Sequence, residues 1–479
     1  MTRIRELPLH RLAALVRSRD LSPVEVTEYY LARIRRLDDC SGAYISVLEE
    51  SALEQARKWE KRVVSDTPDP LPALAGVPLP IKDLDTLAGA PVTFGSRLYT
   101  GLVAPADSVM VGRLRAAGAV FLGKTNTPEF GSTCHTENAI APPTRNPWDT
   151  RLSAGGSSGG AAAAVAAGLA PAAQGSDGGG SIRIPASVCG LFGLKPTRGR
   201  ISGAPDRADL FGLSTAGPIT RTVLDAALLL DVMTVGLPGD AYAAPPPEPG
   251  TTFADHARRE PGRLRVGRFA DTGSTGIPVH PDVLEAYERA TRLLLDLGHE
   301  VEEVRTPVDA HFGGAYARDF QYLWEAVSAA TPVDPAREHE LTPINRWLRE
   351  RARATSAPDL VTAWARLQRG VRSLLTATEP YDAVLSPTLA LPPVPVGHFT
   401  GDGPETEFRR MTEFTPFTSV YNVSGQPSVN VPLHWSPAGV PIGVMLTGRT
   451  GGEGTLLSLS AQLEQARPWA HRVPPGWED

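Results

Sequence analysis

Hydrophobic and polar positions along this 479-residue chain alternate between two periods, one typical of amphipathic helices and one typical of short buried strands. Residues 264–269 and 300–304 have the pattern of strands, and residues 281–297 between them have that of a helix closed by Gly298. This strand–helix–strand order is typical of an α/β layer in which neighbouring strands run parallel.

The same patterns predict a single domain over residues 1–479. Residues 1–70 are expected to form a helical N-terminal arm, in which Ser22 before Pro23 marks the start of a helix. Residues 71–235 contain strands and apolar helices, and residues 306–378 form a long helical segment rich in Trp, Arg and Ala. The expected fold is α/β, with a central, twisted sheet that is mixed but mostly parallel and is covered by helices on both faces.

Two segments near the middle of the chain lack a clear period. Residues 144–154 are predicted to be a loop. Ile182 and Ile184 flank Arg183, which suggests a short extended stretch that is stopped by Pro185.

Composition excludes several functional classes. The net charge of −6 and the absence of a basic run argue against a nucleic-acid surface. The polar N-terminus lacks the apolar region of a signal peptide, and the alanine-rich run over residues 161–173 is broken by Gly168 and Pro171, so no membrane span is expected.

Cysteine usage indicates the compartment. The three cysteines, Cys40, Cys134 and Cys189, show no CxxC spacing, so neither a disulfide framework nor a zinc site is expected. A reducing cytoplasm is the simplest prediction. Because no cluster of metal ligands appears in the sequence, we expect an enzyme without a metal or other cofactor.

The most informative segment covers residues 155–181, where two glycine-rich loops flank an alanine-rich run. Ser157 and Ser158 lie in the first loop, and Ser181 ends the second. Glycines allow the backbone to approach a ligand closely, and successive N–H groups can hold a developing oxyanion. Together these features suggest acyl-transfer chemistry, although a glycine-rich turn with a solvated serine accounts for Ser181 equally well.

A nucleophilic serine needs a base. The histidines lie in ordinary contexts, and even His135, which lies among polar, loop-like residues, is better explained as structural. Lys82 follows an apolar strand at residues 76–81, which would place its ammonium inside the protein, and Ser–Lys variants of the catalytic triad exist. The structural alternative is an ion pair of Lys82 with Asp83 or Asp85.

Several ordered motifs resemble those of the amidase signature family. They are GVP with KD from Gly76, GKTNTPEF from Gly123, TRNPWD from Thr144, GGSSGG from Gly155, SDGGGSIRIPA from Ser176, CGLFGLKPTRGRIS from Cys189, YDAVLSPT from Tyr381 and YNVSGQPSVNVP from Tyr421. The resemblance covers most of the chain and is weakest between about residues 245 and 377. It implies that residues 71–235 hold the signature core and that residues 306–378 cover a variable pocket.

The resemblance also implies a catalytic triad. Ser181 matches the nucleophile, Ser157 matches a bridging serine that follows a cis peptide bond, and Lys82 matches the terminal base. The backbone N–H groups of Gly178, Gly179, Gly180 and Ser181 match the oxyanion hole. Ser176 stands where many members of the family have threonine, and Gly178 stands where some have threonine or isoleucine. These two differences affect the flexibility of the loop that would form the oxyanion hole.

Three alternatives compete with this interpretation. Residues 118–125 formally match a phosphate-binding loop, but a strand-like segment lies between the glycines where the motif needs none. Residues 155–159 formally match a nucleophile elbow with Ser157 as nucleophile, but no apolar strand leads into them. A third alternative is the glutaminase subunit of a tRNA-dependent amidotransferase, although the C-terminal half is more similar to stand-alone amidases, including those acting on cyclic amide oligomers.

Aromatic residues suggest the substrate class. Trp324, Phe417 and Tyr421 are candidates for lining a pocket, with core packing as the alternative for each. They favour an apolar or aromatic amide, and the resemblance admits carbamates (urethanes) and esters as well. The expected partner is this small molecule, with no nucleic acid and no membrane, and a homodimer is the assembly common among similar proteins.

Overall fold

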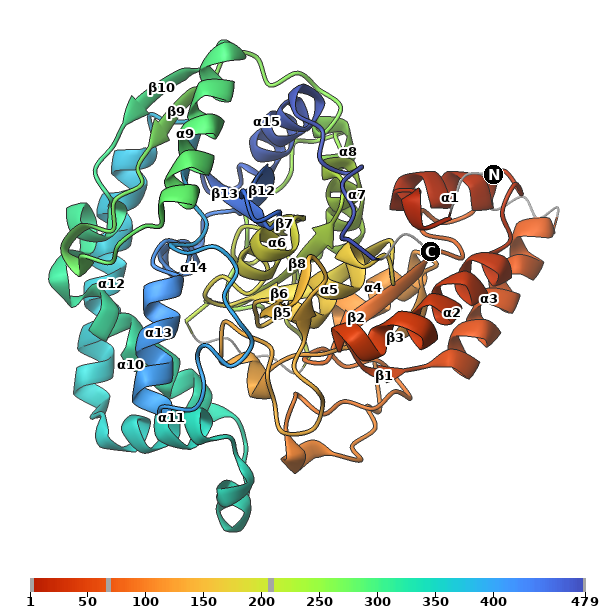
Figure 1. The fold of residues 1–479 in the computed structure, drawn as a ribbon, viewed down its shortest axis with the longest axis horizontal. Helices are drawn as coiled ribbons and strands as arrows, with labels where there is room; N and C mark the ends of the chain where they lie inside the picture. Colours follow the sequence, from red (N-terminus) through yellow and green to blue (C-terminus); the bar gives the residue numbers. More distant parts are fainter. Residues whose placement is uncertain (1–3, 66–69, 206–210, 477–479) are drawn as a thin grey trace.

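The computed structural model describes residues 4–65, 70–205 and 211–476, and Figure 1 shows its arrangement. The strands are β1 (Tyr44–Val47), β2 (Pro78–Lys82), β3 (Val120–Thr125), β4 (Arg145–Asn146), β5 (Asp149–Ser153), β6 (Ala172–Asp177), β7 (Phe192–Lys195), β8 (Thr215–Thr220), β9 (Arg265–Arg268), β10 (Glu300–Glu303), β11 (Ala383–Pro387), β12 (Ser428–Trp435) and β13 (Pro441–Gly448).

The α-helices alternate with these strands over much of the chain. They are α1 (Leu9–Arg17), α2 (Pro23–Ser41), α3 (Glu49–Val64), α4 (Val109–Ala116), α5 (Gly159–Ala166), α6 (Arg183–Cys189), α7 (Val223–Met233), α8 (Phe253–His256), α9 (Pro281–Asp296), α10 (Tyr316–Ala330), α11 (Pro343–Ala354), α12 (Ala357–Thr378), α13 (Pro404–Phe414), α14 (Val420–Ser424) and α15 (Glu453–Ala466).

The large sheet has the strand order β10-β9-β11-β13-β12-β7-β8-β6. It is mixed, as expected, but the expectation of a mostly parallel sheet is wrong. Only the pairs β10–β9 and β9–β11 are parallel, and the other five neighbouring pairs are antiparallel. The strand–helix–strand unit β9–α9–β10 does give a parallel pair. The hairpin from β12 to β13, closed by the bond from the N–H of Ser436 to the carbonyl of Val440, reverses the chain within a few residues.

Helices cover both faces of this sheet, as the sequence predicts. Successive residues of a strand point to opposite faces, and Leu385 and Leu446 pack in one core with α7, α9 and α15. Val384 and Met445, each one position earlier, pack instead with α12 and α14. Because neighbouring strand positions enter different cores, the sheet is buried on both sides.

The N-terminal arm is mostly helical and lies at one end of the molecule (Figure 1). The side chain of Ser22 caps α2 by accepting hydrogen bonds from the N–H groups of Val24 (3.0 Å) and Glu25 (3.3 Å), which confirms the predicted helix start. The arm also contributes β1, which pairs antiparallel with β3 in a second sheet of order β1-β3-β2. Residues 1–3 and 66–69 of the arm lie outside the described residues.

Residues 145–153, predicted to be a loop, form a short antiparallel hairpin of β4 and β5. The side-chain oxygen of Asn146 accepts a hydrogen bond of 3.0 Å from the N–H of Trp148 and so closes the turn locally. This kind of turn leaves little trace in the hydrophobic pattern. Across the described ranges, no helix is long and apolar enough to cross a membrane.

Candidate active site

Lys82 is the last residue of β2 and its side chain is fully buried, as the sequence predicts. Its Nζ lies 2.8 Å from Oγ of Ser157, 2.9 Å from Oγ of Ser158 and 3.1 Å from Oγ of Ser176. The backbone N–H of Lys82 donates to Oε1 of Gln174 at 3.0 Å, which fixes the end of β2 against β6. A buried amine is therefore held by three serine hydroxyls.

The two carboxylates proposed as structural partners of Lys82 make other bonds. Oδ1 of Asp83 pairs with Nζ of the buried Lys124 at 3.0 Å, and Oδ2 of Asp85 accepts a hydrogen bond of 2.9 Å from Gln174. Lys124 also donates to the carbonyl of Asp85 at 2.8 Å. Since Lys124 lies within β3 and is held by these bonds, the phosphate-binding loop suggested by residues 118–125 is not formed.

Ser157 lies in the first glycine-rich loop, directly before α5. The peptide bond between Gly156 and Ser157 is cis, and the Ser157 side chain is buried. The N–H of Ser158 donates to the carbonyl of Ser181 at 3.2 Å, so the two glycine-rich loops are joined directly. This contact brings together the serines that the sequence separates by more than twenty positions.

The strand that leads into this loop, β5, is mostly polar and partly exposed, so no apolar strand precedes Ser157. β5 belongs to the two-stranded β4–β5 sheet and not to the central one. Ser157 Oγ contacts a lysine at 2.8 Å, whereas a nucleophile elbow would need a histidine there. His135 is buried instead beside Glu407, with Nε2 3.0 Å from its Oε1. The geometry therefore does not support the elbow alternative.

Ser181 ends the second glycine-rich loop and is followed by α6. The extended stretch expected at residues 182–185 is wrong. Oδ2 of Asp177 accepts hydrogen bonds from the N–H groups of Ile182 (3.1 Å) and Arg183 (3.4 Å), which satisfies the start of the helix. Pro185 falls in the first turn, where its missing N–H breaks no helical bond.

The predicted oxyanion donors differ in their bonding. The N–H of Gly180 donates to Oδ1 of Asp177 at 2.7 Å. Among the described residues, the N–H groups of Gly178, Gly179 and Ser181 have no hydrogen-bond partner. Three of the four N–H groups are thus unbonded within the described protein, and the fourth is bonded to Asp177.

Asp177 and Arg183, which the sequence analysis did not single out, hold this loop in place. Nε and Nη2 of Arg183 each lie 2.9 Å from a carboxylate oxygen of Asp177, and both side chains are fully buried. Burial raises the pKa of Asp177, but the Arg183 guanidinium and further donors such as the amide of Asn422 outweigh it and hold that pKa well below its ordinary value. The sequence did offer one signal of this buried ion pair, since a charged residue, Arg183, lies between two isoleucines.

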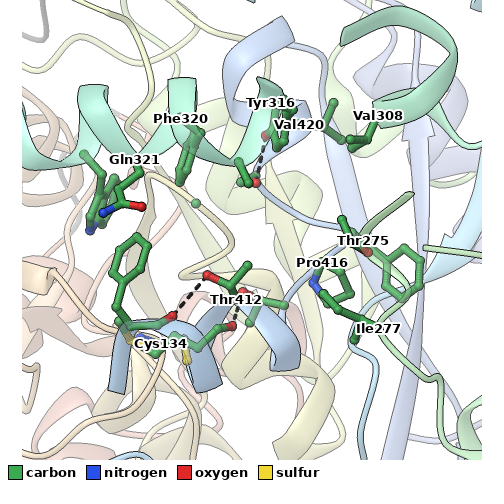
Figure 2. A pocket seen from close by; sticks show the side chains of 18 of the residues that line it. Cys134, Thr275, Ile277, Val308, Tyr316, Phe320, Gln321, Thr412, Pro416 and Val420 are labelled. Carbon is green, nitrogen blue, oxygen red and sulfur yellow. Dashed lines mark hydrogen bonds between the residues drawn. The ribbon is translucent and has the colours of Figure 1, made fainter. Parts of the chain in front are cut away.

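A cavity of about 490 Å³ opens beside Ser181, and Figure 2 shows it from close by. Tyr316, Phe320 and Gln321 reach into it from α10, and Thr412 reaches into it from α13. Most of its wall is apolar. The aromatic and aliphatic lining residues are Ile184, Phe269, Ile277, Pro307, Val308, Tyr316, Ala317, Phe320, Trp324, Trp347, Phe408, Pro416, Phe417 and Val420.

Two of the three predicted pocket residues line this cavity. Trp324 and Phe417 do so, whereas Tyr421 is only 1 % exposed and packs in the core with α12, so the prediction for Tyr421 is wrong. Tyr421 belongs to the short helix α14, whose residues are all buried. Aromatic character alone does not distinguish a core residue from a pocket residue.

Trp324 also covers the glycine loop. A Cβ at Gly178 would lie 3.4 Å from the Trp324 ring, and a Cβ at Gly179 would lie 3.7 Å from Phe320. The indole Nε1 of Trp324 donates to the carbonyl of Ser132 at 3.1 Å, which fixes the ring in this position. The aromatic side of α10 therefore limits how much room a ligand has above the unbonded N–H groups.

Comparisons with known proteins identify the family of the chain. A model of the family described as Amidase matches residues 25–457. The AmiB2 protein of Mycobacterium tuberculosis is 40% identical over 453 residues, which covers 93% of each chain.

Two solved structures share the whole architecture. The structure of 6-aminohexanoate cyclic dimer hydrolase complexed with substrate has a TM-score of 0.89 and 32% identity, over 98% of this chain and 99% of that chain. A bacterial aryl acylamidase of the amidase signature family has a TM-score of 0.87 and 27% identity, over 97% and 96% of the two chains. The chain therefore belongs to the amidase signature family and is a hydrolase that acts on amides.

Proposed function

We propose that the protein cleaves the C–N bond of small apolar or aromatic amides through an acyl-enzyme formed on Ser181. The observation that carries this proposal is the contact of 2.8 Å between Nζ of Lys82 and Oγ of Ser157, in a buried cluster joined to the Ser181 loop. A lysine and a bridging serine together can serve as the base that a serine nucleophile requires.

The proposed reaction has two steps. In the first, Ser181 Oγ attacks the amide carbonyl while its proton passes through Ser157 to the neutral amine of Lys82. The proton then returns through Ser157 to the leaving nitrogen, the C–N bond breaks, and the acyl group remains on Ser181. In the second step, water adds to the acyl carbon by the same proton route and releases the acid. Such proton transfer contributes about 10²–10⁴-fold to the rate.

The negative oxygen of each tetrahedral intermediate would be held by the N–H groups of Gly178, Gly179 and Ser181. Gly180 is a less suitable donor because its N–H already bonds to Asp177. Loss of one such donor costs roughly 2.7–4 kcal/mol of transition-state stabilisation in comparable sites. Asp177 and Arg183 would act as positioning residues for this loop.

The cavity supports the substrate class. Its volume of about 490 Å³ and its aromatic walls suit an apolar acyl or aryl group. The two solved relatives are a 6-aminohexanoate cyclic dimer hydrolase and an aryl acylamidase, which supports the same substrate class. Because an oxyanion hole recognises the carbonyl and not the leaving atom, carbamates and esters are included in the proposal.

The remaining expectations form part of the same proposal. Among the described residues, no group of three or more His, Cys, Asp or Glu side chains could hold a metal ion, which is compatible with metal-independent hydrolysis. All three cysteines are free, which is compatible with a reducing cytoplasm. A homodimer with no nucleic-acid or membrane partner completes the proposal.

A panel of substrates tests this function. Hydrolysis of an anilide, an aliphatic amide, an aryl carbamate, an aryl ester and glutamine would be measured for the wild type, Ser181→Ala and Lys82→Ala. Ser51→Ala and Lys58→Ala are matched controls, since both side chains are exposed on α3. We expect activity on an anilide or amide that disappears in both site variants and persists in both controls.

Two results would contradict the proposal. Activity that survives Ser181→Ala would exclude Ser181 as the nucleophile. Activity on glutamine alone would favour the alternative of a glutaminase subunit, and a search for an amidotransferase partner would then follow.

A further inference from the structure

Gln321 extends from α10 into the cavity beside Ser181 (Figure 2). Its side chain is partly exposed, so a molecule in the cavity can reach it. Trp324, three positions later on the same helix, lies over Gly178 of the glycine loop. Because positions three apart in a helix adjoin each other, Gln321 lies one side chain away from the ring that covers this loop. The reaction proposed above gives Gln321 no role.

An ion pair between α10 and α11 holds the side-chain amide of Gln321. Its Nε2 donates to Oε1 of the fully buried Glu325 at 2.7 Å. The same oxygen of Glu325 accepts from Nε of Arg351 at 2.5 Å. A guanidinium group can only donate, so this oxygen is an acceptor, and the Gln321 atom beside it is the amide nitrogen and not the amide oxygen. These bonds fix the orientation of the amide group.

The amide oxygen of Gln321 is left facing away from Glu325. Among the described residues, no group donates a hydrogen bond to this Oε1. A carbonyl oxygen can only accept, whereas a hydroxyl group can turn to donate or to accept. The hydroxyls of Thr412 and Thr415, which also line the cavity, already donate to backbone carbonyls of α13 at 3.0 and 2.8 Å. Gln321 therefore offers an acceptor of fixed orientation in a mostly apolar wall.

We propose that Gln321 is a specificity-determining residue, whose Oε1 accepts a hydrogen bond from an N–H group in the acyl part of the substrate. This inference rests on the proposed function and narrows its substrate class to acyl chains that carry a second amide N–H. A wholly apolar chain would displace water from the cavity and leave Oε1 unbonded, which opposes binding. An N–H at the matching position restores the hydrogen bond, and a site of this kind rejects analogues that lack the donor.

Two matched series of 4-nitroanilides test this role. In one series the acyl chain ends in an acetamido group, and in the other a CH₂ replaces the N–H of that group to give a methyl ketone. Chains of increasing length place the group at successive depths in the cavity. We expect the acetamido member at the matching length to have a kcat/KM about tenfold above that of its ketone, and a smaller ratio at other lengths.

Variants of Gln321 show whether its amide oxygen causes the preference. Gln321→Leu removes the acceptor at similar side-chain size and should abolish the tenfold ratio by lowering kcat/KM for the acetamido member alone. Gln321→Met removes the acceptor and keeps an unbranched chain, so it replaces Gln321→Leu if that variant does not fold. Gln465→Leu makes the same change at an exposed position of α15 and should keep the ratio.

Calorimetric binding of both series to Ser181→Ala makes the test independent of hydrolysis. The same tenfold ratio is expected between the two dissociation constants, again lost in a variant that also carries Gln321→Leu. Equal affinity for both members at every chain length, or a ratio that persists without Gln321, would overturn the inference. Hydrolysis of both series without preference would overturn this inference and leave the proposed function standing. Absence of hydrolysis with a Gln321-dependent binding ratio would do the reverse.

Discussion

Asp177 and Arg183 form a buried, two-pronged ion pair around the residue proposed as the nucleophile. Each of the two guanidinium nitrogens lies 2.9 Å from a carboxylate oxygen, and the chain between the two residues is the glycine loop that ends in Ser181. The same carboxylate accepts the N–H of Gly180 at 2.7 Å. The pair therefore fixes the conformation of the loop from within.

Removal of the guanidinium should unfold this loop. Arg183→Met leaves the Asp177 carboxylate buried and unpaired, which should cost about 3–5 kcal/mol of unfolding free energy. Denaturant unfolding followed by circular dichroism measures this loss. The exposed pair of Arg265 and Glu302 offers a control, because solvent screens this pair and Arg265→Met should cost far less. Equal losses in both variants would contradict a structural role for the buried pair.

Ser157→Ala should affect amides more than activated esters. In the proposed reaction Ser157 returns a proton to the leaving nitrogen, whereas a phenolate can leave without one. We expect hydrolysis of an anilide to fall by about 10²–10⁴-fold and that of an aryl ester to fall less. Steady-state kcat/KM for the two substrates gives the comparison, with Ser51→Ala as control. An equal fall for both substrates would show that Ser157 does not protonate the leaving group.

Two neighbouring glycines should respond differently to alanine. A Cβ at Gly180 would lie 2.6 Å from Oγ1 of Thr418, and the φ of +134° is unfavourable for any side chain. A Cβ at Gly179 would meet only Phe320, at 3.7 Å. We expect Gly180→Ala to lower the unfolding free energy by about 1–3 kcal/mol and Gly179→Ala to cost less than that, as judged by melting temperature. The opposite order would contradict the described loop conformation.

Lys195 should make the stability of the protein depend on pH. Burial and the nearby Arg183 guanidinium lower the pKa of Lys195 from 10.5 to about 7, although Asp177 opposes this. Between these two pH values the unfolded chain binds the proton and the folded protein does not, so the contribution of Lys195 to stability falls as pH falls from 10.5 to 7 and is constant below that.

The variant Lys195→Met removes this titration. Relative to the wild type it should be most stabilised at pH 7, and its advantage should shrink by about 1.4 kcal/mol for each pH unit between 7 and 10. Thermal unfolding at several pH values measures this trend. Lys58→Met, on the exposed face of α3, serves as the control variant. A pH-independent effect of Lys195→Met would show that Lys195 titrates normally.

The sequence by itself determined which residues are proposed to carry the chemistry. The apolar run before Lys82 predicts a buried strand end, and the glycines around Ser157 and Ser181 predict tight loops, because both signals are local and depend on residue type. The helices on both faces of the sheet follow from the same periodicity. The ordered motifs identify the family without any knowledge of which residues are in contact.

Only the tertiary structure decided which elements are neighbours. Whether β12 pairs with β13 or with a more distant strand depends on hydrogen bonds between segments, and the hydrophobic pattern of a strand is the same for either partner. The hydrogen bond from the N–H of Gly180 to Asp177 and the helical start of α6, where an extended stretch was predicted, likewise depend on where the Asp177 carboxylate points.

Cavities are the clearest case of this limit. Trp324 and Tyr421 are both large and aromatic, yet one lines the cavity beside Ser181 and the other is enclosed by the core. His135 gave no sequence signal beyond its polar surroundings, and its contacts with Glu137 and Glu407 arise only when the fold brings these residues together. An empty space is left by the packing of distant segments, and no local pattern along the chain encodes it.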